Sequence, residues 1–200
     1  MRIGIFGGTF DPPHAGHKKY ADELKDRLSL DKLLVIPTAT PPHKDGKNPI
    51  GSLDRLEMLR ILFRDDDGVE VSDMEIARGG KSYTYETVTL LHGIYPEDEL
   101  IFLLGSDMLL SFHNWRNPDV ILSKVKICAV TRTDEINEEK LKGYIEEYFP
   151  DNKDRFITCD FDPIEISSTE VRNAIRNGES VEGLVDEQVM QYIKEKELYL

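Results

Sequence analysis

Six short runs of apolar and β-branched residues recur along the chain, and they constrain the fold more than any other feature. They lie at residues 2–6, 32–37, 69–73, 100–104, 125–130 and 155–160. The segments between them carry helical periodicity, which predicts repeated strand–helix units. Several runs are apolar at nearly every position, as expected for parallel strands that helices cover on both faces. The sequence therefore predicts an α/β fold with a Rossmann-like, doubly wound parallel sheet in a three-layer α/β/α arrangement.

The length and composition set the broad class of protein. A chain of 200 residues is long enough for one substantial core, so we expect a single domain over residues 1–200. No apolar run approaches the roughly 18 residues that span a membrane, and the start of the chain does not resemble a signal peptide. Cys128 and Cys159 lack CxxC spacing, which indicates neither a disulfide framework nor a cysteine-based metal site. We expect a cytoplasmic protein without a membrane partner.

The charge is unevenly distributed. The formal net charge of -13 argues against nucleic acid as a partner, because contacts to its phosphates need clustered Lys and Arg. Residues 1–60 nevertheless carry ten Lys and Arg against eight Asp and Glu, a net charge of +2. A small anionic ligand would meet the least repulsion near this first part of the chain.

The segment GGTFDPPHAGH, residues 7–17, follows the first predicted strand. In a doubly wound sheet, ligands bind beyond the carboxyl ends of the strands. The two glycines permit close approach to the main chain, and Pro12 and Pro13 direct the chain into a helix. His14 and His17 would lie on one face of its first turn. Together with the positive helix end, these imidazoles favour an anion site over a generic turn. A zinc site would need further ligands, of which His43 is one candidate.

A second segment, ISSTEVR at residues 166–172, follows the last predicted strand. Ser167 and Glu170 fit a capping box at the start of a helix that ends near Gly178, and this interpretation holds whatever the function. The same helix start would expose N–H groups beside the hydroxyls of Ser168 and Thr169. Arg172 follows one turn later, so the segment also fits a second phosphate-binding helix N-terminus.

Two features lie between these segments. LLGSDMLL places Gly105 and Asp107 at the end of the fourth predicted strand. Asp107 fits either a helix N-cap or a carboxylate that holds a sugar hydroxyl. Trp115 is the only tryptophan, and its polar neighbours favour a stacking surface for a ligand over a place in the core.

These motifs resemble those of the bacterial nicotinate-nucleotide adenylyltransferases, in the HxGH nucleotidyltransferase superfamily. GGTFDPPHAGH, PTATPPHK, SYTYETV, LLGSDMLLSFHNW and ISSTEVR cover nearly the whole chain in the order of that family. The resemblance implies a fold of the nucleotidyltransferase type. It also implies transfer of AMP from ATP to nicotinate mononucleotide, which releases pyrophosphate and forms deamido-NAD in NAD biosynthesis.

The resemblance also implies the roles of individual residues. His14, His17 and Arg172 would be catalytic. ATP would contact Gly8, Thr9, Phe10, His14, His17, Gly105, Asp107, Ser168, Thr169 and Arg172. The mononucleotide would contact His43, Lys44, Thr84, Tyr85 and Trp115. One departure is that Arg132, Thr133 and Asp134 stand where the family is expected to have an Arg-Pro-Gly-like turn. This difference leaves the role of Arg132 open.

The predicted reaction agrees with the residues present. In-line attack by an acceptor phosphate needs no protein nucleophile, only alignment and charge neutralisation. We expect Mg²⁺ as the cofactor, held mainly by the ATP phosphates, and no metal site built by the protein. Nicotinamide mononucleotide or phosphopantetheine as the acceptor, cytidylyl transfer to a phosphorylated alcohol, and a nucleotide-sensing module without turnover are the alternatives. A homo-oligomer is also compatible with the sequence.

Overall fold

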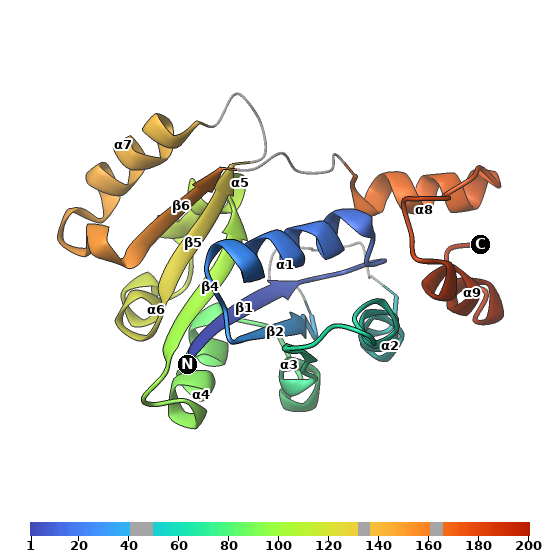
Figure 1. The fold of residues 1–200 in the computed structure, drawn as a ribbon, viewed down its shortest axis with the longest axis horizontal. Coiled ribbons are helices and arrows are strands. Elements are labelled where there is room, and N and C mark those ends of the chain that lie inside the picture. The colour runs from blue at the N-terminus through green and yellow to red at the C-terminus, as the bar shows by residue number, and fades with distance from the viewer. Residues whose placement is uncertain (41–49, 132–136, 161–165) are drawn as a thin grey trace.

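A single parallel sheet organises the part of the chain that the computed structural model describes, which is residues 1–40, 50–131, 137–160 and 166–200. Its strands are ordered β3-β2-β1-β4-β5-β6 (Figure 1). They are β1 Arg2–Gly8, β2 Lys32–Pro37, β3 Val69–Val71, β4 Glu99–Gly105, β5 Lys126–Thr131 and β6 Phe156–Asp160. Each predicted run thus forms a strand, and the doubly wound order is confirmed. The third strand is shorter than predicted, because Asp73 already serves as the N-cap of the next helix.

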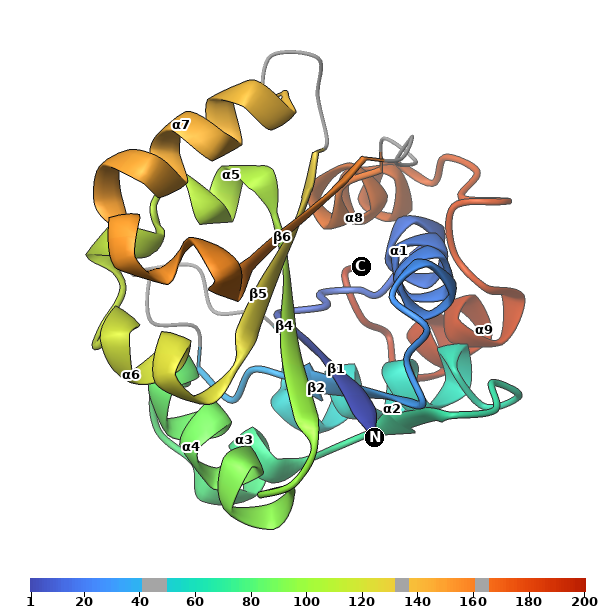
Figure 2. The same cartoon turned by 60° about the vertical axis from the view of Figure 1, so that its left-hand side comes forward.

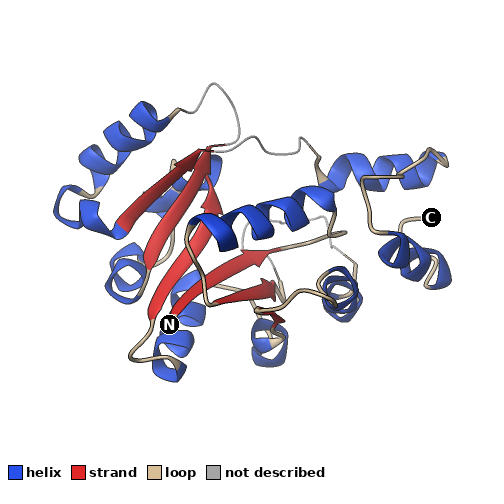
Figure 3. Cartoon of the chain, viewed as in Figure 1, coloured by secondary structure: helices blue, strands red, loops and turns tan. Residues whose placement is uncertain are grey.

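Helices cover both faces of the sheet (Figures 2 and 3). The core on one face contains residues from α1 (Ala15–Arg27), α2 (Ser52–Leu62), α8 (Ser168–Asn177) and α9 (Glu187–Glu195). The core on the other face contains residues from α4 (Thr84–Ile94), α5 (Ser106–Leu109), α6 (Pro118–Lys124) and α7 (Glu138–Tyr148). The shorter elements are α3 (Met74–Arg78) and the 3₁₀ turns η1 (Phe112–Asn114) and η2 (Pro150–Arg155). The predicted three layers are therefore present.

Alternation along the strands explains why both cores form. In β2, Leu33 and Val35 pack into the first core, while Leu34 and Ile36 pack into the second. Successive side chains of a strand point to opposite faces, so a strand that is apolar throughout needs a helical layer on each side. Within the described residues, no helix is both long and apolar enough to cross a membrane.

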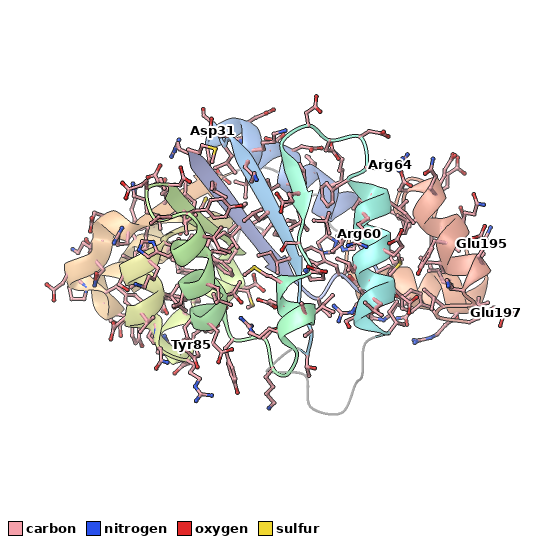
Figure 4. The ribbon with its side chains drawn as sticks, turned by 90° about the horizontal axis from the view of Figure 1, so that it is seen from below. Asp31, Arg60, Arg64, Tyr85, Glu195 and Glu197 are labelled. Atoms are coloured by element: carbon pink, nitrogen blue, oxygen red, sulfur yellow. The ribbon has the colours of Figure 1, made fainter. Side chains whose placement is uncertain are left out.

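The strand order reverses at β1, which lies between β2 and β4. Helices from the two halves of the chain therefore diverge here, and a crevice opens beyond the carboxyl ends of the strands. Asp31, just before β2, and Tyr85, in the first turn of α4, lie at the top and the bottom edge of the view in Figure 4. Tyr85 lies at the end toward which the strands run, where the site residues are expected.

Candidate active site

The segment after β1 makes a tight turn around the ring of Phe10. Phe10 has a φ of 51°, in the left-handed region that side chains seldom adopt. Its buried ring lies against Gly8, and a Cβ atom at Gly8 would come within 2.8 Å of it. Glycine is therefore needed at position 8 to make room for the Phe10 ring, in addition to the close approach of a ligand that the sequence suggested. Gly7 has more room, since its Cβ would lie 3.6 Å from the Phe102 ring.

The two histidines lie together at the start of α1, as predicted. His14 is the extended N-cap residue, and its backbone N–H donates to Nδ1 of His17 at 3.2 Å. Their ring centroids are 3.7 Å apart, and the Phe10 ring meets His17 nearly edge-on at 5.0 Å. Because Nδ1 of His17 accepts a hydrogen bond, a neutral His17 carries its proton on Nε2. His14 is buried, whereas His17 is partly exposed.

The start of α8 contacts the segment after β1 directly. Oγ of Ser168 donates to the Pro12 carbonyl at 3.0 Å, and Arg172 donates to the Asp11 carbonyl at 2.5 Å and to Oγ1 of Thr169 at 3.0 Å. The predicted meeting of the two segments is thus confirmed, and the starts of α1 and α8 lie next to each other in Figure 1. The nearest partner of Arg172 is, however, the loop itself.

The capping box at α8 is also present. Ser167 accepts from the backbone N–H of Glu170 at 3.2 Å, and the carboxylate of Glu170 accepts from the backbone N–H of Ser167 at 2.8 Å. Hydrogen bonds from Ser167 lower the pKa of Glu170. The helix ends at Gly178, whose φ is 67°. The start of α8 therefore has both the capping box and the contacts that Ser168 and Arg172 make with the loop after β1.

Asp11 connects the same loop to the end of the chain. Tyr199 donates to Oδ1 of Asp11 at 2.7 Å, and Nη1 of Arg172 lies 3.8 Å from Oδ2. Burial, together with the hydrogen bond to Asp11, raises the pKa of Tyr199. Sequence reasoning missed this pair because the partners are separated by nearly the whole chain. No local pattern marks either of them.

Arg55, on α2, is a second residue that sequence reasoning missed. It is fully buried, and its guanidinium donates to the carbonyls of Thr9 at 2.7 Å, Thr38 at 2.6 Å and Ala39 at 3.2 Å. These carbonyls follow β1 and β2, so one side chain links both loops. Burial lowers the pKa of Arg55. A signal did exist, because Leu59 and Leu62 follow it at i+4 and i+7, which places Arg55 on the apolar face of its helix.

A cavity of about 640 Å³ opens beside this loop, at the carboxyl ends of β1 and β2. Phe102 and Trp115 meet edge-on with centroids 6.2 Å apart, and Arg116 lies over the Tyr83 ring at 4.7 Å. The residues that line it are Ile5, Gly7, Gly8, Thr9, Ile36, Thr38, Glu75, Ser82, Tyr83, Thr84, Thr87, Phe102, Met108, Asn114, Trp115 and Arg116.

The lining differs in one respect from the predicted mononucleotide pocket. Of the residues expected to contact the mononucleotide, Thr84 and Trp115 line this cavity, whereas Tyr85 is not among its lining residues. The hydroxyl of Tyr85 donates instead to its neighbour Glu86 at 2.8 Å. Tyr83, one residue before α4 begins, supplies the aromatic wall. Whether Tyr83 or Tyr85 lines the cavity depends on where α4 starts, and a sequence predicts the exact end of a helix poorly.

The end of β4 corrects another expectation. Gly105 is the N-cap of α5, and Asp107 lies in the first turn of that helix with an exposed side chain. An N-cap role for Asp107 is therefore wrong. Its carboxylate faces solvent at the carboxyl edge of the sheet, which leaves it accessible to a ligand.

Some predicted residues lie outside the described part of the chain. These are His43, Lys44 and Arg132, together with Thr133 and Asp134. Among the residues that the structure does describe, no three His, Cys, Asp or Glu side chains come together as a metal site would require.

Comparison with known proteins places the chain in a family. The profile of the family described as cytidylyltransferase-like matches residues 5–174. The probable nicotinate-nucleotide adenylyltransferase of Clostridium botulinum (strain Eklund 17B / Type B) is 40% identical over 200 residues, covering 99% of this chain and 98% of its own length. Its counterpart from Lactiplantibacillus plantarum is 39% identical over 199 residues, covering 99% and 88%.

Solved structures agree on the fold. The Plasmodium falciparum nicotinic acid mononucleotide adenylyltransferase complexed with NaAD superposes with a TM-score of 0.81 at 18% identity, covering 99% of this chain and 97% of that one. A Vibrio parahaemolyticus protein described as a putative nicotinate-nucleotide adenylyltransferase gives a TM-score of 0.70 at 22% identity, covering 99% and 94%. The chain therefore belongs to the cytidylyltransferase-like family, among the nucleotidyltransferases to which the nicotinate-nucleotide adenylyltransferases belong.

Proposed function

We propose that this protein transfers the adenylyl group of ATP to nicotinate mononucleotide, which forms deamido-NAD and pyrophosphate. One observation carries the proposal. The histidine pair, at a helix start beside Ser168 and Arg172, adjoins an aromatic cavity that shares the loop after β1 with it. Curated relatives at 36–40% identity are named for this activity. A phosphate-binding end and a pocket for a flat ring are the two parts that such a reaction needs.

The phosphates of ATP would lie at the starts of α1 and α8. Backbone N–H groups and the positive helix ends attract anions there, and His14 and His17 add donors. Ser168, Thr169 and Arg172 would bind the outer phosphates. Arg172 would do so while it holds the loop after β1, because its side chain is 20% exposed. The adenosine ribose would contact Gly105 and Asp107, while Gly8, Thr9 and Phe10 would offer backbone groups.

The reaction itself is an in-line displacement. A phosphate oxygen of the mononucleotide attacks the α-phosphorus of ATP, and the bond from that phosphorus to the oxygen bridging to the β-phosphate breaks. Pyrophosphate leaves with the electron pair. Nε2–H of His17 would donate to the α-phosphoryl oxygens, where negative charge builds up in the transition state. The hydrogen bond from the His14 backbone to Nδ1 supports this orientation.

The acceptor would occupy the cavity. Trp115 would stack against the pyridine ring, and Tyr83 and Thr84 would lie beside it. The start of α4 carries partial positive charge, which favours the carboxylate of nicotinate. His43 and Lys44, and a role for Tyr85, stay predictions.

Mg²⁺ fits this site as an ion that arrives with ATP. The described residues around the histidines offer nitrogen and hydroxyl donors, while both oxygens of Asp11 already face Tyr199 or Arg172. Phosphate oxygens would therefore hold the ion, and it would neutralise part of their charge. A cytoplasmic location, a single domain and a homo-oligomer likewise stay predictions.

The test is pyrophosphate release from Mg-ATP with nicotinate mononucleotide, nicotinamide mononucleotide and phosphopantetheine as acceptors. We expect the highest kcat/KM with nicotinate mononucleotide. His17→Ala should lower kcat at least about a hundredfold, the scale of losing one transition-state donor. His92→Ala, at the far end of α4, is the matched control and should leave kcat unchanged. If the enzyme turned over neither nicotinate mononucleotide nor nicotinamide mononucleotide, the proposal would be rejected.

A further inference from the structure

Glu75 is a buried carboxylate on the cavity wall that has only half of its hydrogen bonds. It lies on α3, is 6% exposed and lines the cavity. Oγ1 of Thr87 donates to its Oε1 at 2.5 Å. Its Oε2 is buried and has no hydrogen-bond partner within the described residues. A buried carboxylate oxygen without a donor is costly, so this atom points to a missing partner.

The nearby cations are engaged elsewhere. Arg78 donates to Oγ1 of Thr87 at 3.3 Å through both Nη atoms. Its Nε is buried without a hydrogen-bond partner among the described residues and lies 3.6 Å from the Glu86 carboxylate. Arg116 lies over the rings of Tyr83 and Tyr85. No ion pair to Glu75 occurs among the residues that the structure describes. Because Glu75 lines the cavity, a ligand or water there can supply the missing donor.

A second cavity residue has the same deficit. Oγ1 of Thr38 is buried without a hydrogen-bond partner among the described residues, and Thr38 lines the same cavity. Its backbone is held in place, because its N–H donates to the Gly8 carbonyl at 2.9 Å and its carbonyl accepts from Arg55 at 2.6 Å. The cavity thus offers one hydroxyl, which can donate or accept, and one carboxylate oxygen, which can only accept.

These two atoms suit a sugar hydroxyl better than the substituent of the pyridine ring. A ribose hydroxyl can donate to Glu75, and its neighbour can pair with Thr38. The carboxylate of nicotinate has no proton to donate and repels the charge of Glu75. We propose that Glu75 is a substrate-binding residue whose Oε2 accepts a hydrogen bond from a ribose hydroxyl of the mononucleotide. This inference rests on the proposed function, and it makes Glu75 a determinant of selectivity for ribonucleotides.

The test pairs one substitution with the removal of one substrate hydroxyl. Glu75→Gln keeps the size of the side chain and an oxygen for Thr87, but replaces the acceptor with an amide. Nicotinate mononucleotide, its 2′-deoxy and 3′-deoxy analogues and nicotinamide mononucleotide are compared in kcat/KM at saturating Mg-ATP. Their Kd values are measured by calorimetry without ATP, so that one readout does not depend on turnover.

In the wild type, removal of the contacted hydroxyl should weaken kcat/KM and Kd by about tenfold or more, as expected for a hydrogen bond to a charged group. In Glu75→Gln, the same removal should cost about threefold or less, mainly through KM. Glu86→Gln changes a partly exposed carboxylate nearby that does not line the cavity, and it should keep the wild-type discrimination. Thermal unfolding of both variants confirms that they are folded.

The results separate the two proposals. Equal penalties for both analogues in the wild type and in Glu75→Gln would overturn the role of Glu75 while the adenylyltransferase activity stood. A change confined to the preference between nicotinate and nicotinamide would also overturn it, because Glu75 would then face the ring substituent. A wild-type protein that binds nicotinate mononucleotide without turnover, and shows the predicted coupling in Kd, would contradict only the proposed function. Failure to bind it would overturn both.

Discussion

The hydrogen bond between Tyr199 and Asp11 offers a direct test of how the end of the chain supports the active-site loop. Tyr199→Phe removes one hydroxyl and keeps the ring, which is 8% exposed and belongs to the core. The hydroxyl donates at 2.7 Å to a carboxylate whose side chain is 10% exposed. A hydrogen bond to a charged group contributes about 1.5–3 kcal/mol, and the carboxylate oxygen would stay buried without this donor. We therefore expect the free energy of unfolding to fall by about 1.5–3 kcal/mol.

Urea unfolding measures this loss, and Tyr192→Phe is the matched control. The Tyr192 hydroxyl donates to Oδ1 of Asp54 at 3.0 Å, but the residue is partly exposed and its partner lies on α2 instead of in the loop. Its loss should cost about 0.5–1 kcal/mol. For a protein of this size, the Tm of Tyr199→Phe should fall by roughly 3–12 °C. Its kcat should also fall, by less than in His17→Ala, because Asp11 precedes His14 in the same loop.

The pH dependence of the free energy of unfolding gives a second measure of the hydrogen bond between Tyr199 and Asp11. The folded-state pKa of Tyr199 lies above its ordinary value because of burial and the bond to Asp11. The unfolded chain therefore loses this proton first as the pH rises above about 10, and the stability from Tyr199 declines from there upward. Tyr199→Phe should lack this part of the alkaline decline. Burial and the hydrogen bond to Asp54 also raise the pKa of Tyr192, to about 12, so the comparison with Tyr192→Phe is made in stability at neutral pH. If Tyr199→Phe lost no more stability there than Tyr192→Phe, the reasoning would be refuted.

Three further predictions concern other contacts. Arg55→Met leaves the carbonyls that follow β1 and β2 without their donor, so the free energy of unfolding in urea should fall by about 3–5 kcal/mol; a loss below about 1 kcal/mol would show that the link is dispensable. Gly8→Ala places a Cβ 2.8 Å from the Phe10 ring and should lower kcat/KM, whereas Gly93→Ala, which has open space, should not; equal activity would contradict the packing argument. Hydrogen bonding from Cys128, 3.5 Å away, lowers the pKa of Cys159 to about 7. The rate of Cys159 alkylation should therefore rise through neutral pH and shift upward in Cys128→Ala, and a wild-type midpoint near 8.5 would contradict this.

The sequence by itself predicted the elements and the two main motifs. The six strands were identifiable because apolar side chains on both faces leave an unbroken run, which is a local signal. The capping box of α8 and the placement of His14 and His17 at a helix start are also local, since they depend on spacings of three residues. The meeting of the first and last motifs followed from the rule that parallel strands share one carboxyl edge.

Tertiary structure alone decided which polar side chains support the site. Arg55 binds carbonyls in two different loops, Tyr199 reaches Asp11 from the end of the chain, and Glu75 meets Thr87 across two helices. Each pair joins residues that no spacing rule connects, and each is fixed by how layers pack. Tyr83 lines the cavity and Tyr85 does not, because α4 begins between them and thereby sets their directions. Local periodicity thus specifies the elements, whereas burial in three dimensions determines the partners of the polar groups.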